Sequence, residues 1–423
     1  MAGEQKKYRL KPVPVTILLA VLLAGILGGL IWAYNSVNPP SSTPVELPVS
    51  SGEPENGSAA GADSSAESAI PEPQSIRVIG VGDDLIHTAI FSQAKKRAGG
   101  NGYDFTYAYE NVKKLIDLAD IASINQETVM VKEQAPSDYP MFNSPTELGD
   151  FLVDYGFDVV NLANNHAFDQ VPAMGEAAVI SYLDFWQTHP EVLTTGVYRN
   201  QEDCDNIRTM EKNGVTFAFL GMSELDNGLS LPKNSEALMM RTSDEEKIQQ
   251  QITKANEMAD VVVVNVHWGV EYDITPADSQ KALARKMVDW GADIILGHHP
   301  HVIQPVEYLE REDGTKAIVA YSLGNFISAQ DTGWRMIGGA LDVTVTKNFE
   351  TKKTEITEAR FVPLVTQYEG NCANVRNYLL SDYTDLLARS HGVRAGKTPQ
   401  FSLEWVQNAV NEVIDKSFLT PYM

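Results

Sequence analysis

Cysteine is almost absent from this chain of 423 residues, which contains only Cys204 and Cys372. No CxxC pair exists, so a zinc ribbon and a thioredoxin-like redox motif are excluded. The two cysteines could form one disulfide if the folded part lies outside the cytoplasm. The sequence leaves that pairing open, because it does not show whether the two Cα atoms come close enough.

Positive charge is also scarce. The chain has 33 Lys and Arg against 56 Asp and Glu, which gives a formal net charge of −23. Binding of nucleic acid through a broad basic face needs many side chains that neutralise phosphates, so we expect no nucleic-acid partner. Apolar residues make up 43% of the chain, an ordinary share for a domain with a hydrophobic core. The acidity by itself indicates good solubility.

Residues 15–34 lack charge of either sign. This segment is long enough for a helix that crosses ~30 Å of hydrocarbon. Its length and the lack of a small-x-small cleavage site disfavour a cleaved signal peptide. We therefore predict one transmembrane helix over residues 15–34. Gly25 and Gly29 form a GxxxG pattern, which can pair two such helices into a homodimer.

Basic residues lie on one side of this segment only. No Lys or Arg follows it until Arg77, and those before it are Lys6, Lys7, Arg9 and Lys11. The positive-inside bias places the tail 1–14 in the cytoplasm and the main domain outside the cell membrane. Residues 35–75 are rich in Pro, Ser, Ala, Gly and Glu up to the first strand, and we expect a disordered linker there.

From residue 76 onward, apolar strand-like runs alternate with segments of helical spacing. This alternation predicts an α/β fold, a multi-layer sandwich, over residues 76–366. "VVVVNVHWG" is a continuous apolar run, typical of a strand buried on both faces. Ser144 and Glu147 form the sequence pattern of a capping box before a helix. A helical extension is expected over residues 367–423.

Polar residues gather where these predicted strands end. In open α/β sheets, sites form at the carboxyl ends of strands. Six of the eight histidines fall in these segments, and only His189 and His391 do not. The strand-end residues are Asp83, Asp84, His87, Asn125, Glu127, Asn164, Asn165, His166, Asp169, His267, Glu271, His298, His299 and His301.

A single histidine at a strand end is most often a hydrogen-bonded structural residue. The coincidence of such residues at five successive strand ends favours a shared site instead. Carboxylates, imidazoles and an Asn carbonyl together suit divalent metals, with imidazole favouring Zn or Fe and oxygen ligands favouring Mn. Two such ions ~4 Å apart share a bridging carboxylate and generate a nucleophile from water.

The ordered motifs "VGDD", "INQETV", "NLANNHAFD", "VNVHWGVEY", "GHHPHVIQPVE" and "YSLGNFI" resemble those of the CapA/PgsA family of capsule and poly-γ-glutamate biosynthesis proteins. That family is similar in fold to the calcineurin-like metallophosphoesterases. The resemblance implies two divalent ions (Mn, Fe or Zn) and an anionic cell-surface polymer, or its synthase complex, as the partner.

The resemblance also implies roles for single residues. His166 would be the catalytic histidine outside the metal shell, oriented by Asp169. Glu271 and Asn325 match family positions near the substrate. His298 is grouped with them as a substrate-binding residue, with a supporting or structural role as the alternative. The metal ligands it implies are Asp83, Glu127, Asn165, His267, His299 and His301. Phosphoesterases of this type carry Asp-x-His at the first strand, but residue 85 here is Leu, and His87 is the candidate substitute.

Two functions stay open at this point. One is a metal-dependent, phosphoesterase-like hydrolase in the synthesis of the polymer. The other is a non-catalytic accessory protein that binds the polymer or its synthase during export or anchoring. The ligand set favours metal binding, but a fold does not fix a function.

Overall fold

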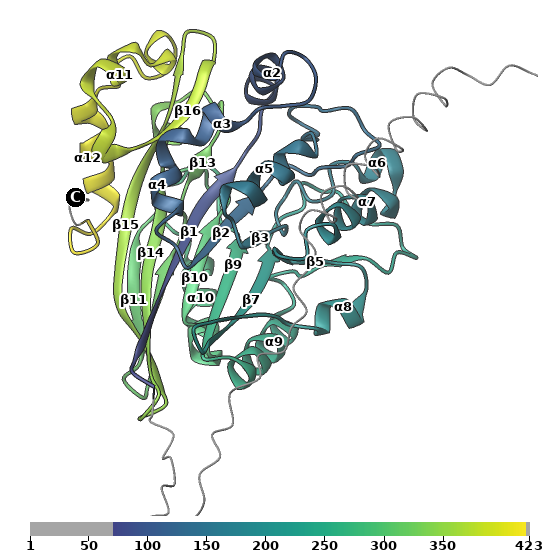
Figure 1. Ribbon diagram of the computed structural model, residues 1–423, viewed down its shortest axis with the longest axis vertical. Helices are drawn as coiled ribbons and strands as arrows, with labels where there is room; N and C mark the ends of the chain where they lie inside the picture. The colour runs from purple at the N-terminus through teal and green to yellow at the C-terminus, as the bar shows by residue number, and fades with distance from the viewer. Residues whose placement is uncertain (1–70, 420–423) are drawn as a thin grey trace, which may run out of the picture. The chain divides into compact units, whose positions relative to one another are not determined.

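Two facing β-sheets form the centre of the computed structural model, which describes residues 71–419 (Figure 1). The order of the first sheet is β16 (Ala373–Leu379), β15 (Lys353–Glu369), β14 (Ile337–Asn348), β1 (Gln74–Asp84), β2 (Ile121–Gln126), β3 (Val159–Asn161) and β4 (Leu193–Thr195), with β13 (Asn325–Ile327) paired to the end of β1.

The second sheet holds the later strands. Its order is β11 (Val306–Glu310), β12 (Lys316–Ala320), β10 (Ile294–His298), β9 (Val261–His267), β7 (Val215–Ser223) and β6 (Arg208–Lys212). The short strands β5 (Val197–Tyr198) and β8 (Leu238–Met239) pair separately. Neighbours β1, β2, β3 and β4 run parallel, as do β7, β9 and β10, so each group ends at one edge of its sheet.

Helices cover the outer faces of both sheets. Those before β9 are α2 (Thr88–Arg97), α3 (Thr106–Tyr109), α4 (Lys113–Ile116), α5 (Glu147–Tyr155), α6 (Val171–Met174), α7 (Glu176–Gln187), α8 (Gln201–Asp205) and α9 (Glu245–Met258). Those after it are α10 (Asp278–Trp290), α11 (Asp385–Ser390) and α12 (Leu403–Val413), and short 3-10 turns are η1 (Glu110–Val112), η2 (Gly333–Met336), η3 (Leu380–Asp382) and η4 (Gly392–Ala395).

The side chains of strand β9 show that the core has two apolar layers. Val261 and Val263 belong to the core cluster shared with the first sheet, whereas Val262 and Val264 pack with α9 and α10. Because side chains alternate across a strand, a strand between two apolar layers is apolar throughout. The predicted α/β layer structure is confirmed in this respect.

Glycines allow strands to approach one another beneath the strand ends. A Cβ on Gly80 of β1 would meet the Leu296 side chain of β10, so here the two sheets lie close together. A Cβ on Gly297 would collide with the backbone oxygen of Tyr321, which follows β12. Residues without a side chain are needed where backbones approach this closely.

The C-terminal segment differs from the helical extension expected over residues 367–423. Its first element is β16, which pairs antiparallel with β15 as the edge strand of the first sheet, and α11 and α12 follow. Val375, Asn377 and Leu379 are buried in alternation, the pattern of a strand. Strand β15 itself crosses residue 366.

Two local expectations also change. Ser144 does not cap α5, because its hydroxyl hydrogen-bonds that of Thr128 instead. Cys204 and Cys372 are both free, so the structure contains no disulfide between them.

The predicted cytoplasmic tail, transmembrane helix and linker up to residue 70 lie outside the described residues. Between residues 71 and 419, the structure has no helix that combines the length and the apolar character needed to cross a membrane.

Substitution of Gly297 by Ala should destabilise the fold strongly. The added methyl group meets backbone rather than a flexible side chain, so the cost of overpacking should reach about 3 kcal/mol. Thermal unfolding measures this as a lower Tm. Gly396→Ala is the matched control, since its Cβ would lie 3.7 Å from the Val393 oxygen in ordinary contact. Equal Tm values for the two variants would contradict the close approach.

Candidate metal centre

The carboxyl ends of strands from both sheets meet at one site. Asp83 ends β1 beside Asn125 of β2, and Glu127 follows β2 directly. His267 ends β9 and lies in register with His298 at the end of β10. These residues are buried, although they are polar or charged.

The turn after β10 has an unusual backbone. His299 and His301 have φ angles of 98° and 57°, in the region that favours glycine. Such conformations cost free energy and persist where the surroundings fix them, often at functional sites. The backbone N–H of His299 donates to Asp83 Oδ2 at 3.3 Å, which ties this turn to β1.

Asp83, Glu127 and His267 form a buried group whose potential ligand atoms all lie within 4.8 Å of one another. Neither carboxylate oxygen of Glu127 has a hydrogen-bond partner. The nearest imidazole nitrogens are Nε2 of His301 at 3.5 Å and Nε2 of His267 at 3.9 Å from Glu127 Oε1. A buried carboxylate without hydrogen bonds is costly unless a cation balances it.

A second group of the same size comprises Glu271, His299 and His301. Nδ1 of His299 is buried and has no hydrogen-bond partner. Glu271 is exposed and follows β9. The structure therefore places Glu271, predicted as a substrate-binding residue, among side chains that could hold an ion.

Burial keeps two of the histidines neutral. It lowers the pKa of His267 well below the ordinary value, and the charge of His299 acts in the same direction. Burial also lowers the pKa of His299 to about 3, with the charge of His301 contributing. Neutral imidazole is the form that binds metals, so both side chains are prepared as ligands.

The pKa values of His301 and of the two buried carboxylates shift in different directions. Burial opposes the charged form of His301, but the charges of Glu127 and Asp83 outweigh it and raise the pKa of His301 to about 9. Burial raises the pKa of Glu127 well above its usual range. For Asp83, burial is outweighed by hydrogen bonds with His298 and His301, and its pKa is lowered. The opposite shifts of Asp83 and His301 agree with a buried ion pair between them, whose atoms lie 3.1 Å apart.

The residues present therefore fit divalent cations. The site offers buried carboxylates and neutral imidazoles, and it leaves Glu127 and Nδ1 of His299 without partners. Nε2 of His267 also lies 3.0 Å from Oδ1 of Asn165, so these two predicted ligands meet at one point. The predicted ligands Asp83, Glu127, Asn165, His267, His299 and His301 all belong to this site.

His166 lies beside these ligands with its predicted partner. Its Nδ1 is 2.8 Å from Oδ2 of Asp169, and only 5% of the residue is exposed. Asp169 also accepts a hydrogen bond from the backbone N–H of Phe142, whose ring packs edge-on against His166. The carboxylate and the ring together fix the orientation of the imidazole.

Three other predicted residues have positions that limit their roles. His87 contacts the Leu85 oxygen and accepts a hydrogen bond from the Ala329 N–H through Nδ1, and it belongs to neither ligand group. His298 is fully buried, with Nδ1 3.5 Å from Asp83 and Nε2 3.3 Å from Asn265. His298 therefore supports the Asp83 carboxylate, and its expected contact with substrate stays a prediction.

Asn325 is likewise a supporting residue. Its Oδ1 lies 3.0 Å from Nδ1 of His301, and its amide donates to the backbone oxygen of Arg335 and to Gln330. Asn325 is 1% exposed. Asn325 therefore orients His301, and its expected contact with substrate stays a prediction.

Asn125 was recognised as a strand-end residue, but the supporting contacts of Asn125 and Asn227 carried no clear signal in the sequence. Asn125 donates to Asp83 Oδ1 at 2.8 Å and accepts from Asn161 of β3. Asn227, from the loop after β7, accepts from Asn165 and lies 3.4 Å from Nδ1 of His166. An asparagine within an apolar strand is the one available sign, because a buried amide needs partners.

The model of the family described as "Bacterial capsule synthesis protein PGA_cap" matches residues 77–330. This range contains every residue of the metal centre. The chain belongs to this family. The PGA biosynthesis protein CapA of Bacillus subtilis is 37% identical over 221 residues, which cover 50% of this chain and 54% of that protein.

The capsule biosynthesis protein CapA of Bacillus anthracis is 33% identical over 245 residues, 55% of this chain and 56% of that protein. The match thus spans about half the length of these relatives.

Among solved structures, a putative 5′-nucleotidase from Staphylococcus aureus aligns with 69% of this chain and 54% of its own, at 16% identity and a TM-score of 0.44. A calcineurin-like phosphoesterase from Bacillus subtilis aligns with 80% of this chain and 96% of its own, at 12% identity and a TM-score of 0.39. With TM-scores below 0.5, the family assignment rests on the sequence match.

Binding of Mn²⁺ should release protons near pH 7. His301, with a pKa of about 9, must lose a proton before it binds an ion. The affinity should therefore rise with pH up to about 9 and fall as pH decreases, by about tenfold per unit for each proton released. Calorimetry in two buffers of different ionisation enthalpy measures the release. Binding without proton release would contradict this assignment of protons.

Proposed function

We propose that this capsule synthesis family member is a metal-dependent hydrolase that cleaves a phosphoester during the synthesis of an anionic surface polymer of the capsule or poly-γ-glutamate type. The observation that carries the proposal is the presence of two possible ligand groups at the strand ends, one of which contains Glu127, whose carboxylate has no hydrogen-bond partner. A scaffold that only binds a polymer does not need a buried carboxylate of this kind.

The centre is proposed to hold two ions, chosen among Mn, Fe and Zn. Asp83, Glu127 and His267 would serve one ion, with Asn165 beside His267. His299 and His301 would serve the other, and His301 lies 3.5 Å from Glu127 of the first group. When bound, such ions polarise a phosphoryl oxygen and supply a nucleophile from water near neutral pH. Glu271, which is exposed beside His299 and His301, would face the substrate side of the site.

His166 is proposed to act on the leaving group. Negative charge develops on the leaving oxygen as the phosphoester bond breaks, and a donor beside it lowers the barrier. The contact with Asp169 at 2.8 Å holds Nδ1, so Nε2 of the same ring is left to donate. Phe142 excludes water from one side of this ring.

Substitution of His166 by Ala should reduce turnover of an aryl phosphodiester by about 10²–10⁴ fold, the usual contribution of a general acid. Metal content should stay nearly unchanged, because His166 is outside the ligand groups. His299→Ala should lose metal as well as turnover. His189→Ala is the matched control, since that imidazole contacts Asp150 away from the site. Kinetics and elemental analysis of the purified full chain measure both effects.

Polymer production distinguishes the hydrolase from an accessory protein. If the chain acts without catalysis, a well-expressed His166→Ala strain makes polymer at the level of the wild type. A hydrolase predicts that production falls as it does on deletion of the gene. Normal polymer in that strain would defeat the catalytic proposal and favour the accessory role.

The chain is further proposed to be anchored in the cell membrane by residues 15–34, with the folded domain outside. The support is the uncharged segment and the basic residues before it. Protease added to intact cells should then remove the domain, as detected with an antibody against the C-terminal half. Cells opened with detergent provide the positive control. A domain that is protected in intact cells but cleaved in opened cells would refute the orientation.

A further inference from the structure

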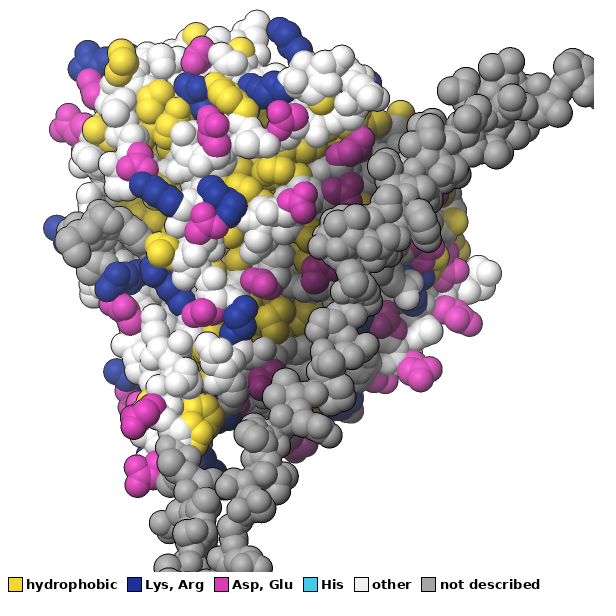
Figure 2. Space-filling model, in the orientation of Figure 1, with side chains coloured by type: hydrophobic (Ala, Val, Ile, Leu, Met, Phe, Trp, Pro, Cys, Tyr) yellow, Lys and Arg dark blue, Asp and Glu magenta, His cyan; other side chains and the backbone are white. Residues whose placement is uncertain are grey.

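A cluster of cations lies on α2 and the β15–β16 turn, outside the metal centre. Lys96 and Arg97, at the end of α2, and Asn371 and Asn374, from the turn, line a cavity of about 580 Å³. We call this cavity the cation pocket. Figure 2 shows basic side chains over α2 at the top of the molecule.

The cations of this pocket lack acidic partners. Between residues 71 and 419, no carboxylate lies within ion-pair distance of Lys96 or Arg97, and the Arg97 guanidinium makes no hydrogen bond. Most other arginines of the described chain pair with a carboxylate, for example Arg199 with Asp184. In a chain with a net charge of −23, unpaired cations of this kind need an explanation.

An aromatic contact holds Arg97 in place, and Arg376 contacts the same ring. Arg97 stacks on the Tyr107 ring at 3.9 Å from its centroid, and Arg376 lies 5.2 Å from the same centroid and donates to the Tyr107 hydroxyl. Nε of Arg376 is buried and has no hydrogen-bond partner. Arg376 lies 3.6 Å from Glu369, a loose ion pair. A guanidinium fixed by an aromatic ring loses little freedom when it binds an anion.

Burial and the neighbouring groups shift the pKa of Arg97, and these effects do not all have the same direction. Burial is the largest cause that lowers the pKa of the guanidinium, and the charge of Arg376 adds to it. Tyr107, Asp104 and Glu110 oppose this effect, and the lowering prevails. An anion in the pocket would balance this partly buried charge.

Contacts of α2 and of the β15–β16 turn connect the cation pocket to His87, which follows the end of β1. Gln93 donates to the backbone oxygen of Cys372 at 2.7 Å and accepts from the Val375 N–H, which fixes the β15–β16 turn on α2. Sγ of Cys372 contacts the Ala329 oxygen at 3.7 Å, and the Ala329 N–H donates to His87, the residue before α2. Figure 1 shows α2 beyond the carboxyl end of β1, where Asp83 lies.

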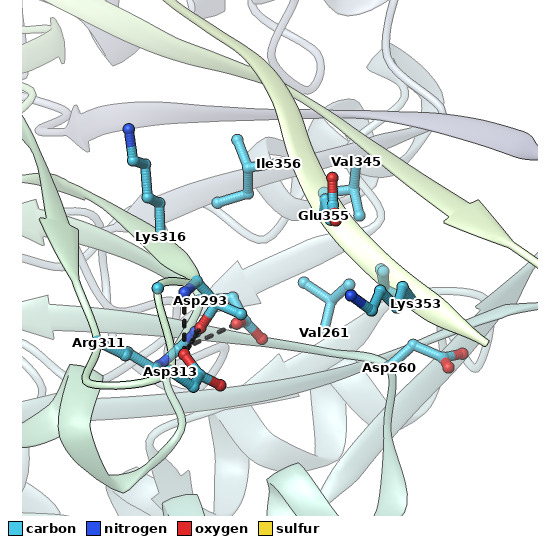
Figure 3. A pocket seen from close by; sticks show the side chains of 13 residues that line it. Asp260, Val261, Asp293, Arg311, Asp313, Lys316, Val345, Lys353, Glu355 and Ile356 are labelled. Carbon is cyan, nitrogen blue, oxygen red and sulfur yellow. Dashed lines mark hydrogen bonds and ion pairs between the residues drawn. The ribbon is translucent and has the colours of Figure 1, made fainter. Parts of the chain in front are cut away.

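A cavity at the opposite end of the sheets provides a contrast (Figure 3). It measures about 350 Å³ and is lined by residues at the amino ends of β9, β10 and β15, among them Asp260, Asp293 and Lys353, and by Arg311, which follows β11. There Arg311 is neutralised by Asp293 and by the backbone oxygens of Val288 and Ala292. Its arginine is therefore not available to an anion, unlike that of the cation pocket.

We propose that the cation pocket binds carboxylate groups of an anionic polymer and holds the polymer beside the metal centre. The guanidinium of Arg97 can take a carboxylate through two parallel N–H donors, and Lys96 and the amides of Asn371 and Asn374 surround the same cavity. The choice of a polycarboxylate rests on the proposed function. The binding step itself needs neither metal nor hydrolysis.

The test measures the Kd of the purified full chain for fluorescein-labelled poly-γ-glutamate at constant salt. Arg97→Gln should weaken binding about tenfold, because it removes a charge-assisted contact. Lys95→Gln is the matched control: it removes the same charge from the same helix, but Lys95 faces Tyr103 and does not line the pocket. Ser92→Asp, an exposed change on the pocket wall, should weaken binding by charge repulsion.

The outcomes separate this proposal from the proposed hydrolase. Polymer binding should persist in chelator and in His299→Ala, so loss of catalysis leaves it intact, and Arg97→Gln should retain hydrolysis of the aryl phosphodiester. Equal weakening by Arg97→Gln and Lys95→Gln would show that binding depends only on the overall charge of this region. That result would overturn the proposal. Tighter binding of polyphosphate than of poly-γ-glutamate, or binding only to anionic lipid vesicles, would overturn it as well.

Discussion

The candidate metal centre depends on the contacts made by the buried carboxylate of Asp83. It receives the amide of Asn125 at 2.8 Å, Nδ1 of His301 at 3.1 Å and the backbone N–H of His299 at 3.3 Å. These partners come from both sheets, so one charge joins the first sheet to the turn after β10. A fully buried charge is tolerated only with such partners, and they fix the ligand histidines at the same time.

The close packing of the sheets follows from the same requirement. Asp83 can contact the turn after β10 only because β1 and β10 approach through Gly80. Interiors packed at this density resist small displacements, so the ligand atoms keep their spacing without an ion. Pre-formed geometry of this kind lowers the free-energy cost of binding a cation.

The sequence predicted the long strands and the ligands at their ends, because apolar runs and strand-end polar residues are local patterns. It separated His299 from His298 only through the family resemblance, although neighbours on a strand face opposite sides. The supporting amides of Asn125 and Asn227 depend on contacts between distant segments, which leave no local trace. The same holds for β16, whose partly polar residues gain strand structure by pairing with β15.

Strand β14 has a consequence for where this domain can end. The family match stops at residue 330, yet β14 pairs along β1 from Gln74 to Val81 and lies between β1 and β15. A chain that ended at residue 330 would leave β1 at the edge of its sheet with unpaired N–H and C=O groups, a surface prone to aggregation. The strand that carries Asp83 is thus completed by residues beyond the matched range, and the unit of sequence similarity is smaller than the unit of folding.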